Sequence, residues 1–179
     1  MIVVIMGIAG CGKTTVGKRL AAALGWPFHD ADDLHPAENV AKMASGRPLD
    51  DADRAPWLAR LRQLVDELSA AGTSAVLACS ALKQSYRERL LGGCAEARLV
   101  YLQASRALLA QRLRERTHHF FPAALLDSQL AALEEPGAEP GAEPGAEPGA
   151  AIVIDAGRPL DDIVADIRAA LGQPRADIG

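Results

Sequence analysis

The chain has 179 residues, of which 49% are hydrophobic, a size and composition that suit one domain with a substantial buried core. It carries 19 Lys and Arg against 23 Asp and Glu, and this formal charge of -4 argues against a general nucleic-acid binder, which would present a basic face. The three cysteines form no paired motif, so we expect a reduced, cytoplasmic protein. No apolar run reaches the roughly 18 residues of a membrane-spanning helix, so we expect no membrane partner.

Segments typical of strands alternate along the chain with segments typical of helices. Residues 1–6 are continuously apolar, as in a strand that is buried on both faces of a parallel sheet. Val16, Leu20 and Leu24 then recur at helical spacing, and Gly25 supplies a helix stop. Four further strands are predicted, over residues 26–30, 74–79, 98–103 and 152–155. The other predicted helices begin at Pro56, Leu82, Ser105, Ala123 and Pro159.

This alternation predicts the fold class. Strands joined by helices form a parallel sheet with right-handed crossovers, and helices then cover both faces of the sheet. The sequence therefore predicts a single α/β domain over residues 1–179, a three-layer, doubly wound sheet of five parallel strands. Residues 135–150 repeat Glu-Pro-Gly-Ala without variation, and we predict a low-complexity surface loop there, because proline and glycine at that density oppose both helix and sheet.

A phosphate-binding loop follows the first predicted strand. Residues 7–14 read Gly-Ile-Ala-Gly-Cys-Gly-Lys-Thr and match the motif G-x-x-x-x-G-K-[ST], placed between a strand and a helix as its mechanism requires. Backbone N–H groups and the helix N-terminus would hold the phosphates of ATP, Lys13 would reach the β- and γ-phosphates, and the Thr14 hydroxyl would bind Mg²⁺. The expected nucleotide contacts are Gly7, Ala9, Gly10, Cys11, Gly12, Lys13, Thr14 and Thr15.

Acidic residues follow the second predicted strand. A P-loop alone does not separate kinases from other nucleotide-binding proteins, but the chain lacks the Asn-Lys-x-Asp segment that reads guanine, which weighs against a GTPase. Asp30 and Asp32 are two residues apart, so on an extended strand end they would face the same way. One carboxylate would organise the metal, and the other would accept the proton of an acceptor hydroxyl. This arrangement favours a kinase that acts on a small molecule.

Long motifs resemble those of the gluconokinases, in the shikimate-kinase-like group of P-loop kinases. They are D-x-D-x-x-H-P and M-x-x-G-x-P-L-x-D-x-D-R-x-P-W-L within residues 29–58, Cys-Ser-Ala-Leu-Lys at residues 79–83, and RLRERTHHFF at residues 112–121. The resemblance covers nearly the whole chain apart from the repeat. It implies a nucleoside-kinase-like fold, a homodimer, and ATP-dependent phosphorylation of the terminal hydroxyl of D-gluconate to 6-phosphogluconate.

The resemblance also implies roles for residues on the acceptor side. By position in the motifs, Asp32 would orient or deprotonate the acceptor hydroxyl, and Asp30 would lie nearer the metal. The residues implied to line the sugar-acid pocket are His35, Arg54 and Arg87, and Lys83 would either hold substrate or be solvated on its helix. Arginine suits a carboxylate because it donates two parallel hydrogen bonds. Trp57 is expected in the core, and Gln129 is expected to approach the substrate.

A helical lid is implied over residues 110–122. Arg112 and Arg116 would bind ATP and stabilise the transferring phosphoryl group, and His119 would contact the substrate. The chain has His118 where the family usually has glycine, which affects the geometry of the lid turn. Adenine is expected against the turn at residues 156–159.

Two alternatives remain at this stage. Shikimate or a nucleoside monophosphate could be the acceptor, although shikimate-type enzymes carry Gly-Gly-Gly where this chain has residues 79–83. The second alternative is a regulatory module that binds ATP and docks on a partner through the repeat. It would leave the Asp30 and Asp32 pair without a purpose.

Overall fold

The computed structural model describes residues 1–115, 123–137 and 151–173. At its centre is a sheet of five parallel strands in the order β2-β3-β1-β4-β5. The strands are β1 (Ile2–Met6), β2 (Phe28–Asp30), β3 (Ala75–Ala78), β4 (Ala97–Gln103) and β5 (Ile152–Asp155). Because strands are added on both sides of β1, the predicted doubly wound parallel sheet is confirmed.

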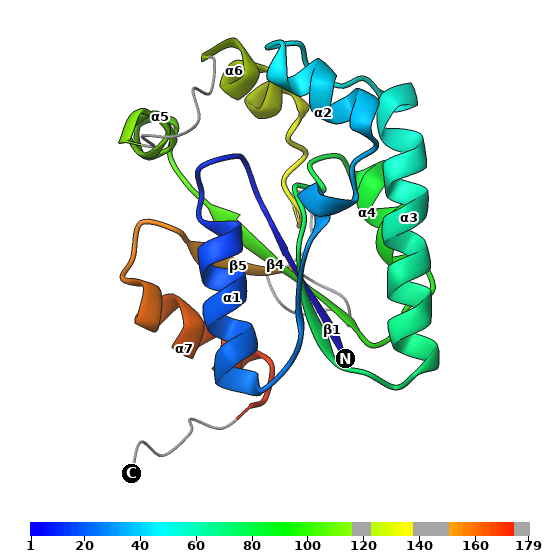
Figure 1. The fold of residues 1–179 in the computed structure, drawn as a ribbon. Helices are drawn as coiled ribbons and strands as arrows, with labels where there is room; N and C mark the ends of the chain where they lie inside the picture. Colours follow the sequence, from blue (N-terminus) through cyan, green and yellow to red (C-terminus); the bar gives the residue numbers. More distant parts are fainter. Residues whose placement is uncertain (116–122, 138–150, 174–179) are drawn as a thin grey trace.

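Helices cover both faces of this sheet. They are α1 (Lys13–Leu24), α2 (Ala37–Ala44), α3 (Asp51–Ala70), α4 (Gln84–Leu91), α5 (Arg106–Glu115), α6 (Ala123–Ala132) and α7 (Leu160–Ala170). Figure 1 shows α1 and α7 on one face and α3 and α4 on the other, with α2, α5 and α6 beyond the carboxyl ends of the strands. Among the described residues, no helix is both long enough and apolar enough to cross a membrane.

The alternation of side chains along β1 builds two separate cores. Val3 and Ile5 belong to the cluster beneath α1 and α7, whereas Ile2, Val4 and Met6 belong to the cluster beneath α3 and α4. All five β1 residues are buried, which explains why the strand is continuously apolar. Each such side chain contributes about 1.5–3 kcal/mol by leaving water, so the sheet rigidly positions the loops at its carboxyl edge.

The predicted start of the longest helix was wrong. Proline favours the first position of a helix, which led to Pro56, but α3 begins five residues earlier at Asp51. Asp50 accepts a hydrogen bond from the Asp53 N–H, and the Asp53 carboxylate accepts one from the Asp50 N–H. This capping box satisfies the first N–H groups of the helix, so the helix starts at Asp51 and Pro56 lies inside it, in its second turn.

The segment after β2 also differs from the prediction. Asp32 does not continue an extended strand but lies in a short 3₁₀-helix, Ala31–Leu34, and α2 follows. The Asp30 carboxylate accepts a hydrogen bond from the Asp32 N–H at 3.2 Å, which caps the 3₁₀-helix and ends the strand. The argument that Asp30 and Asp32 share one side of a strand is therefore wrong.

Parts of two predicted segments lie outside the described residues. Of the lid, residues 110–115 belong to α5, whereas Arg116, His118 and His119 are among the residues not described. Of the repeat, residues 135–137 are described, and Glu135 accepts hydrogen bonds from Tyr101 at 3.0 Å and Gln103 at 3.4 Å. The first glutamate of the repeat therefore packs against the carboxyl end of β4.

Candidate active site

The phosphate loop runs from the end of β1 to the start of α1. Gly7, Gly10 and Gly12 have φ angles of 145°, 89° and 105°, conformations that residues with a side chain rarely adopt. A Cβ at Gly7 would also lie 2.8 Å from the Cys11 sulfur and 2.9 Å from the Leu102 carbonyl oxygen. Lys13 folds over the loop, with its Nζ donating to the Ile8 carbonyl at 3.3 Å. The loop thus has the backbone shape that the motif predicted.

The residues predicted to hold Mg²⁺ lie together. The Thr14 hydroxyl donates to the Asp30 carboxylate at 2.8 Å, which links the start of α1 to the end of β2. Mg²⁺ prefers oxygen ligands and takes one or two from a protein when phosphates and water supply the others. The described residues contain no group of three or more His, Cys, Asp or Glu that could hold a metal, so a metal here would rely on the nucleotide phosphates. The Thr14 and Asp30 pair fits that kind of site.

Cys79, at the end of β3, shows that the charged groups converge. Burial is the main cause that raises the pKa of the Cys79 thiol to about 12; a hydrogen bond with the Ala81 backbone lowers it, the charges of Asp32 and Asp30 raise it, and the charge of Lys13 lowers it. Both carboxylates and the P-loop lysine therefore contribute to the electrostatic field at one buried thiol. Asp30, Asp32 and Lys13 thus all lie on the side of the sheet where β3 ends at Cys79.

A cavity of about 330 Å³ adjoins the phosphate loop on the side of α5 and α7. Its lining includes Gly10, Gly12, Thr15, Arg112 and Arg158, and it reaches the turn that was expected to hold adenine. Arg112 donates to the Cys11 carbonyl at 3.1 Å and to the Ala156 carbonyl at 2.9 Å, so it ties the loop to that turn. The Cys11 side chain is buried in the core, which leaves only its backbone available to a nucleotide.

A second cavity, of about 500 Å³, lies between α3, α4 and α6. Arg54 and Lys83 line it, as expected of the sugar-acid pocket, and Gln129 reaches it from α6. Gln129 also accepts a hydrogen bond from the Ala9 N–H at 2.8 Å, so this cavity adjoins the phosphate loop. Arg87 instead donates to the Ala81 and Leu82 carbonyls at 3.1 and 3.0 Å, and burial lowers the pKa of its guanidinium.

Asp51 and Tyr86 belong to this cavity and were not predicted as site residues. Lys83 donates to both Asp51 carboxylate oxygens, at 2.7 and 2.9 Å, and the Tyr86 hydroxyl donates to the same carboxylate. The hydrogen bonds from Lys83 and then Tyr86 lower the pKa of Asp51, and Asp51 raises that of Lys83. Asp51 occurs in the M-x-x-G-x-P-L-x-D-x-D-R motif, so a signal was present in the sequence.

His35 packs against Trp57. The two rings are stacked, with centroids 4.4 Å apart and planes 7° apart, and the Trp57 Nε1 donates to the Ala31 carbonyl at 2.7 Å. Trp57 is fully buried, as predicted for a core residue. Burial, followed by the positive charge of Arg54, lowers the pKa of His35 from 6.5 to about 4. His35 is therefore neutral at pH 7.

The lowered pKa of His35 predicts a pH dependence of stability. As the pH falls from about 6.5 to about 4, the unfolded chain protonates this histidine and the folded chain does not, so the free energy of unfolding decreases across that window. Urea unfolding at pH 7 and at about pH 4.5 should show a larger loss for the wild type than for His35→Gln. Equal losses would show that His35 does not titrate differently in the two states.

Ala81 is a strained residue beside the site. It is fully buried and has a φ of 41°, although it is not glycine. We expect Ala81→Val to destabilise the protein by roughly 2–3 kcal/mol, because a β-branched residue is poorly tolerated at positive φ and has no room there. Ala81→Gly should change the stability by less than about 1 kcal/mol, because relief of strain offsets the entropy of the unfolded chain. Urea unfolding of both variants measures these effects.

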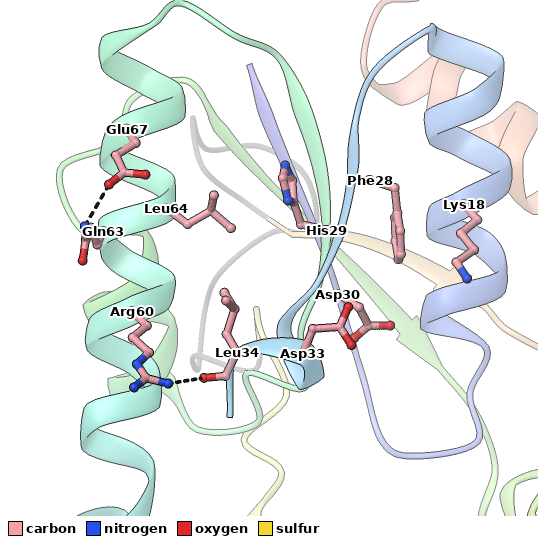
Figure 2. A pocket seen from close by; sticks show the side chains of 10 residues that line it. All are labelled: Lys18, Phe28, His29, Asp30, Asp33, Leu34, Arg60, Gln63, Leu64 and Glu67. Carbon is pink, nitrogen blue, oxygen red and sulfur yellow. Dashed lines mark hydrogen bonds between the residues drawn. The ribbon is translucent and has the colours of Figure 1, made fainter. Parts of the chain in front are cut away.

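A larger cavity, of about 550 Å³, lies at the β2 edge of the sheet. Figure 2 shows it between α1 and α3, with Lys18 and Phe28 on one side and Arg60, Gln63 and Glu67 on the other. Of the predicted site residues that the structure describes, only Asp30 lines this cavity. Among the described residues, none lines both this cavity and the cavity that contains Arg54 and Lys83.

Comparison with known proteins finds relatives over most of the chain. The family model described as AAA domain matches residues 2–136. A gluconokinase from Gluconobacter oxydans is 54% identical over 134 residues, which cover 75% of each chain. A probable gluconokinase from Xenopus tropicalis is 44% identical, with 93% of this chain and 91% of that protein covered.

A solved structure supports the same assignment. The crystal structure of a gluconokinase from Sinorhizobium meliloti superposes with a TM-score of 0.79 at 40% sequence identity, covering 95% of this chain and 90% of the other. These relatives share the sequence over most of their length and not only the P-loop. The chain therefore belongs to the gluconokinase family of P-loop kinases.

Proposed function

We propose that this protein transfers the γ-phosphoryl group of ATP to the terminal hydroxyl of D-gluconate, giving 6-phospho-D-gluconate and ADP. Membership of the gluconokinase family supports this substrate. One structural observation carries the proposal: Gln129 lines the cavity that contains Arg54 and Lys83, and it also accepts a hydrogen bond from Ala9 of the phosphate loop. An acceptor in that cavity would lie next to the phosphates of ATP.

The residues of the phosphate loop would bind and orient ATP. Backbone N–H groups and Lys13 would hold the phosphates, and Arg112, already placed between the loop and the adenine turn, would stabilise charge on the transferring group. Thr14 and Asp30 would hold Mg²⁺, which neutralises phosphate charge when it is bound. Arg116 and His119 keep their proposed roles in phosphoryl and substrate binding.

Asp32 would act on the acceptor hydroxyl. As the hydroxyl oxygen forms its bond to the γ-phosphorus, the bond between that phosphorus and the β–γ bridging oxygen breaks, and ADP leaves. The proton of the hydroxyl passes to the Asp32 carboxylate. The position of Asp32 in the 3₁₀-helix that directly follows Asp30, the partner of Thr14 in the phosphate loop, supports this role.

The gluconate carboxylate and its other hydroxyls would be bound by residues of the acceptor side, away from the phosphate loop. Arg54 would donate two parallel hydrogen bonds to the carboxylate, and His35 would serve as a neutral hydrogen-bonding group beside it. Lys83 would contribute charge next to Asp51. Arg87 would contribute the guanidinium hydrogens that its contacts to Ala81 and Leu82 leave over.

The test is ADP release from ATP and Mg²⁺ with separate acceptors: gluconate, shikimate, glucose, nucleoside monophosphates, and none. We expect release with gluconate alone. Release with another acceptor instead would support kinase activity but reject gluconate as the substrate. ATP binding without release in any sample would reject the kinase itself, and omitting Mg²⁺ tests the metal.

A homodimer and a cytoplasmic location complete the proposal, the first from the resemblance to the family and the second from the unpaired cysteines. Sedimentation velocity at micromolar concentration measures the first. A monomer at every concentration would reject the dimer, and phosphoryl transfer would be unaffected because all the residues named above come from one chain.

A further inference from the structure

Asn39 is a buried amide that neither the sequence motifs nor the proposed chemistry assigns. It lies on α2 and has 5% of its surface exposed. Its Nδ2 lies 2.7 Å from the Asp53 carbonyl oxygen and 3.4 Å from the His35 Nδ1. A buried side-chain amide is costly unless its polar atoms are hydrogen-bonded, so these two partners account for the position of the side chain.

The chemistry of the partners decides which way the hydrogens point. A backbone carbonyl only accepts hydrogen bonds, so the Asn39 atom beside the Asp53 carbonyl must be the NH₂ nitrogen. That nitrogen has two hydrogens and no acceptor lone pair. Its second hydrogen points to the His35 Nδ1, which must therefore carry a lone pair. A neutral histidine with an unprotonated Nδ1 has its single proton on Nε2.

The plane of the His35 ring is set independently. The stack on Trp57 holds the ring flat against a fully buried indole, which is itself bonded to the Ala31 carbonyl. The guanidinium of Arg54, which lines the acceptor cavity, is near enough to affect the titration of His35. Among the described residues, the His35 Nε2 makes no hydrogen bond, and it is not one of the buried side-chain atoms that lack a partner, so it is exposed enough for a ligand to reach it.

We propose that Asn39 is a positioning residue that holds His35 as its Nε2–H tautomer, so that His35 meets the acceptor substrate as a neutral hydrogen-bond donor. The role of the donor in substrate binding rests on the proposed function, whereas the tautomer does not. This donor would favour acceptor substrates that place an oxygen lone pair opposite the His35 Nε2–H, such as a hydroxyl or carboxylate of a sugar acid. An acceptor that offered only a donor there would bind poorly.

Nitrogen-15 NMR of the histidine rings tests the tautomer directly. In the wild-type protein at pH 7, the His35 signals should be those of a neutral ring protonated on Nε2. In Asn39→Asp, a carboxylate replaces the NH₂ and accepts a hydrogen bond, so the proton should move to Nδ1 or the ring should become charged. A wild-type ring protonated on Nδ1 would overturn the proposal, even if no variant folds and whatever the substrate is.

Steady-state kinetics test the consequence for binding. Asn39→Leu keeps the size of the side chain and removes the donor, and we expect the KM for gluconate to rise about tenfold with kcat and the KM for ATP changed by less than about threefold. Lys42→Met is the matched control, because Lys42 also joins α2 to the start of α3, through Asp53 and Asp50, and does not contact His35. The control should leave the KM for gluconate unchanged.

The two mutations at His35 and Asn39 should also be coupled. In a His35→Ala background, Asn39→Leu should raise the KM for gluconate by less than about twofold, because the group that Asn39 positions is gone. An equal effect in both backgrounds, or a rise with Lys42→Met as large as that with Asn39→Leu, would show that Asn39 only stabilises α2. If gluconate is not a substrate, the NMR result still decides the tautomer.

Discussion

Replacing Lys13 by alanine is expected to lower kcat at least about 1000-fold and to weaken the binding of ATP about tenfold or more. The Lys13 ammonium lies over the phosphate loop, with its Nζ 3.3 Å from the Ile8 carbonyl, where it can move to the β- and γ-phosphates. Its charge counts most in the transition state, when negative charge shifts along the phosphates in a site with little water. ADP release measures kcat, and calorimetric titration with ATP and Mg²⁺ measures affinity.

Lys18→Ala is the matched control for this prediction. Lys18 lies on the same helix as Lys13, but its Nζ is 5.8 Å from the centre of the Phe28 ring and it lines the cavity at the β2 edge (Figure 2). The change of residue is identical, and the expected change in kcat is less than about twofold. A Lys13→Ala enzyme that retained a tenth of the wild-type kcat would remove Lys13 from the phosphoryl transfer.

Replacing Asp32 by asparagine is expected to lower kcat at least about 100-fold while the dissociation constant for ATP changes by less than about twofold. An amide keeps the size and the hydrogen-bonding oxygen of the carboxylate, but it does not accept a proton at neutral pH, so a positioned base is lost. The affinity for ATP should be retained because Thr14 pairs with Asp30 and not with Asp32. Single-turnover ADP formation separates this loss from product release.

The neighbouring carboxylate provides the control. Asp33 is in the same 3₁₀-helix but lines the cavity at the β2 edge, so Asp33→Asn should keep kcat within about twofold of the wild type. If Asp32→Asn were fully active, the hydroxyl would lose its proton to another group. If both variants lost activity equally, the effect would reflect the net charge of the 3₁₀-helix and not a base.

The features predicted correctly from sequence are those that a few neighbouring residues determine. The apolar run of β1 and the glycines of residues 7–14 act within one turn of chain, so they predict the strand, the loop and the start of α1. The predicted stop at Gly25 is confirmed for the same reason, since its φ is 67°. Long family motifs indicated His35, Arg54 and Lys83, although not what these side chains contact.

Local patterns failed where two signals competed at one place. Asp30 reads as the end of a strand, and extrapolating that strand put Asp32 on the same side. In the structure, the Asp30 carboxylate accepts the Asp32 N–H and turns the chain into a 3₁₀-helix. Side-chain capping of the backbone outweighed the extended conformation, as it did at Asp50, where a capping box overrode the proline signal.

The chain by itself therefore determined the parallel α/β fold, the phosphate loop and the family of the enzyme. Only the tertiary structure decided how the acceptor side is built: the contact of Gln129 with Ala9, 120 residues away, and the pairing of Lys83 with Asp51. The stack of His35 on Trp57 and the bond from Asn39 to Asp53 are of the same kind. These contacts depend on how α2, α3 and α6 pack over the carboxyl edge of the sheet, and no spacing within one segment encodes that packing.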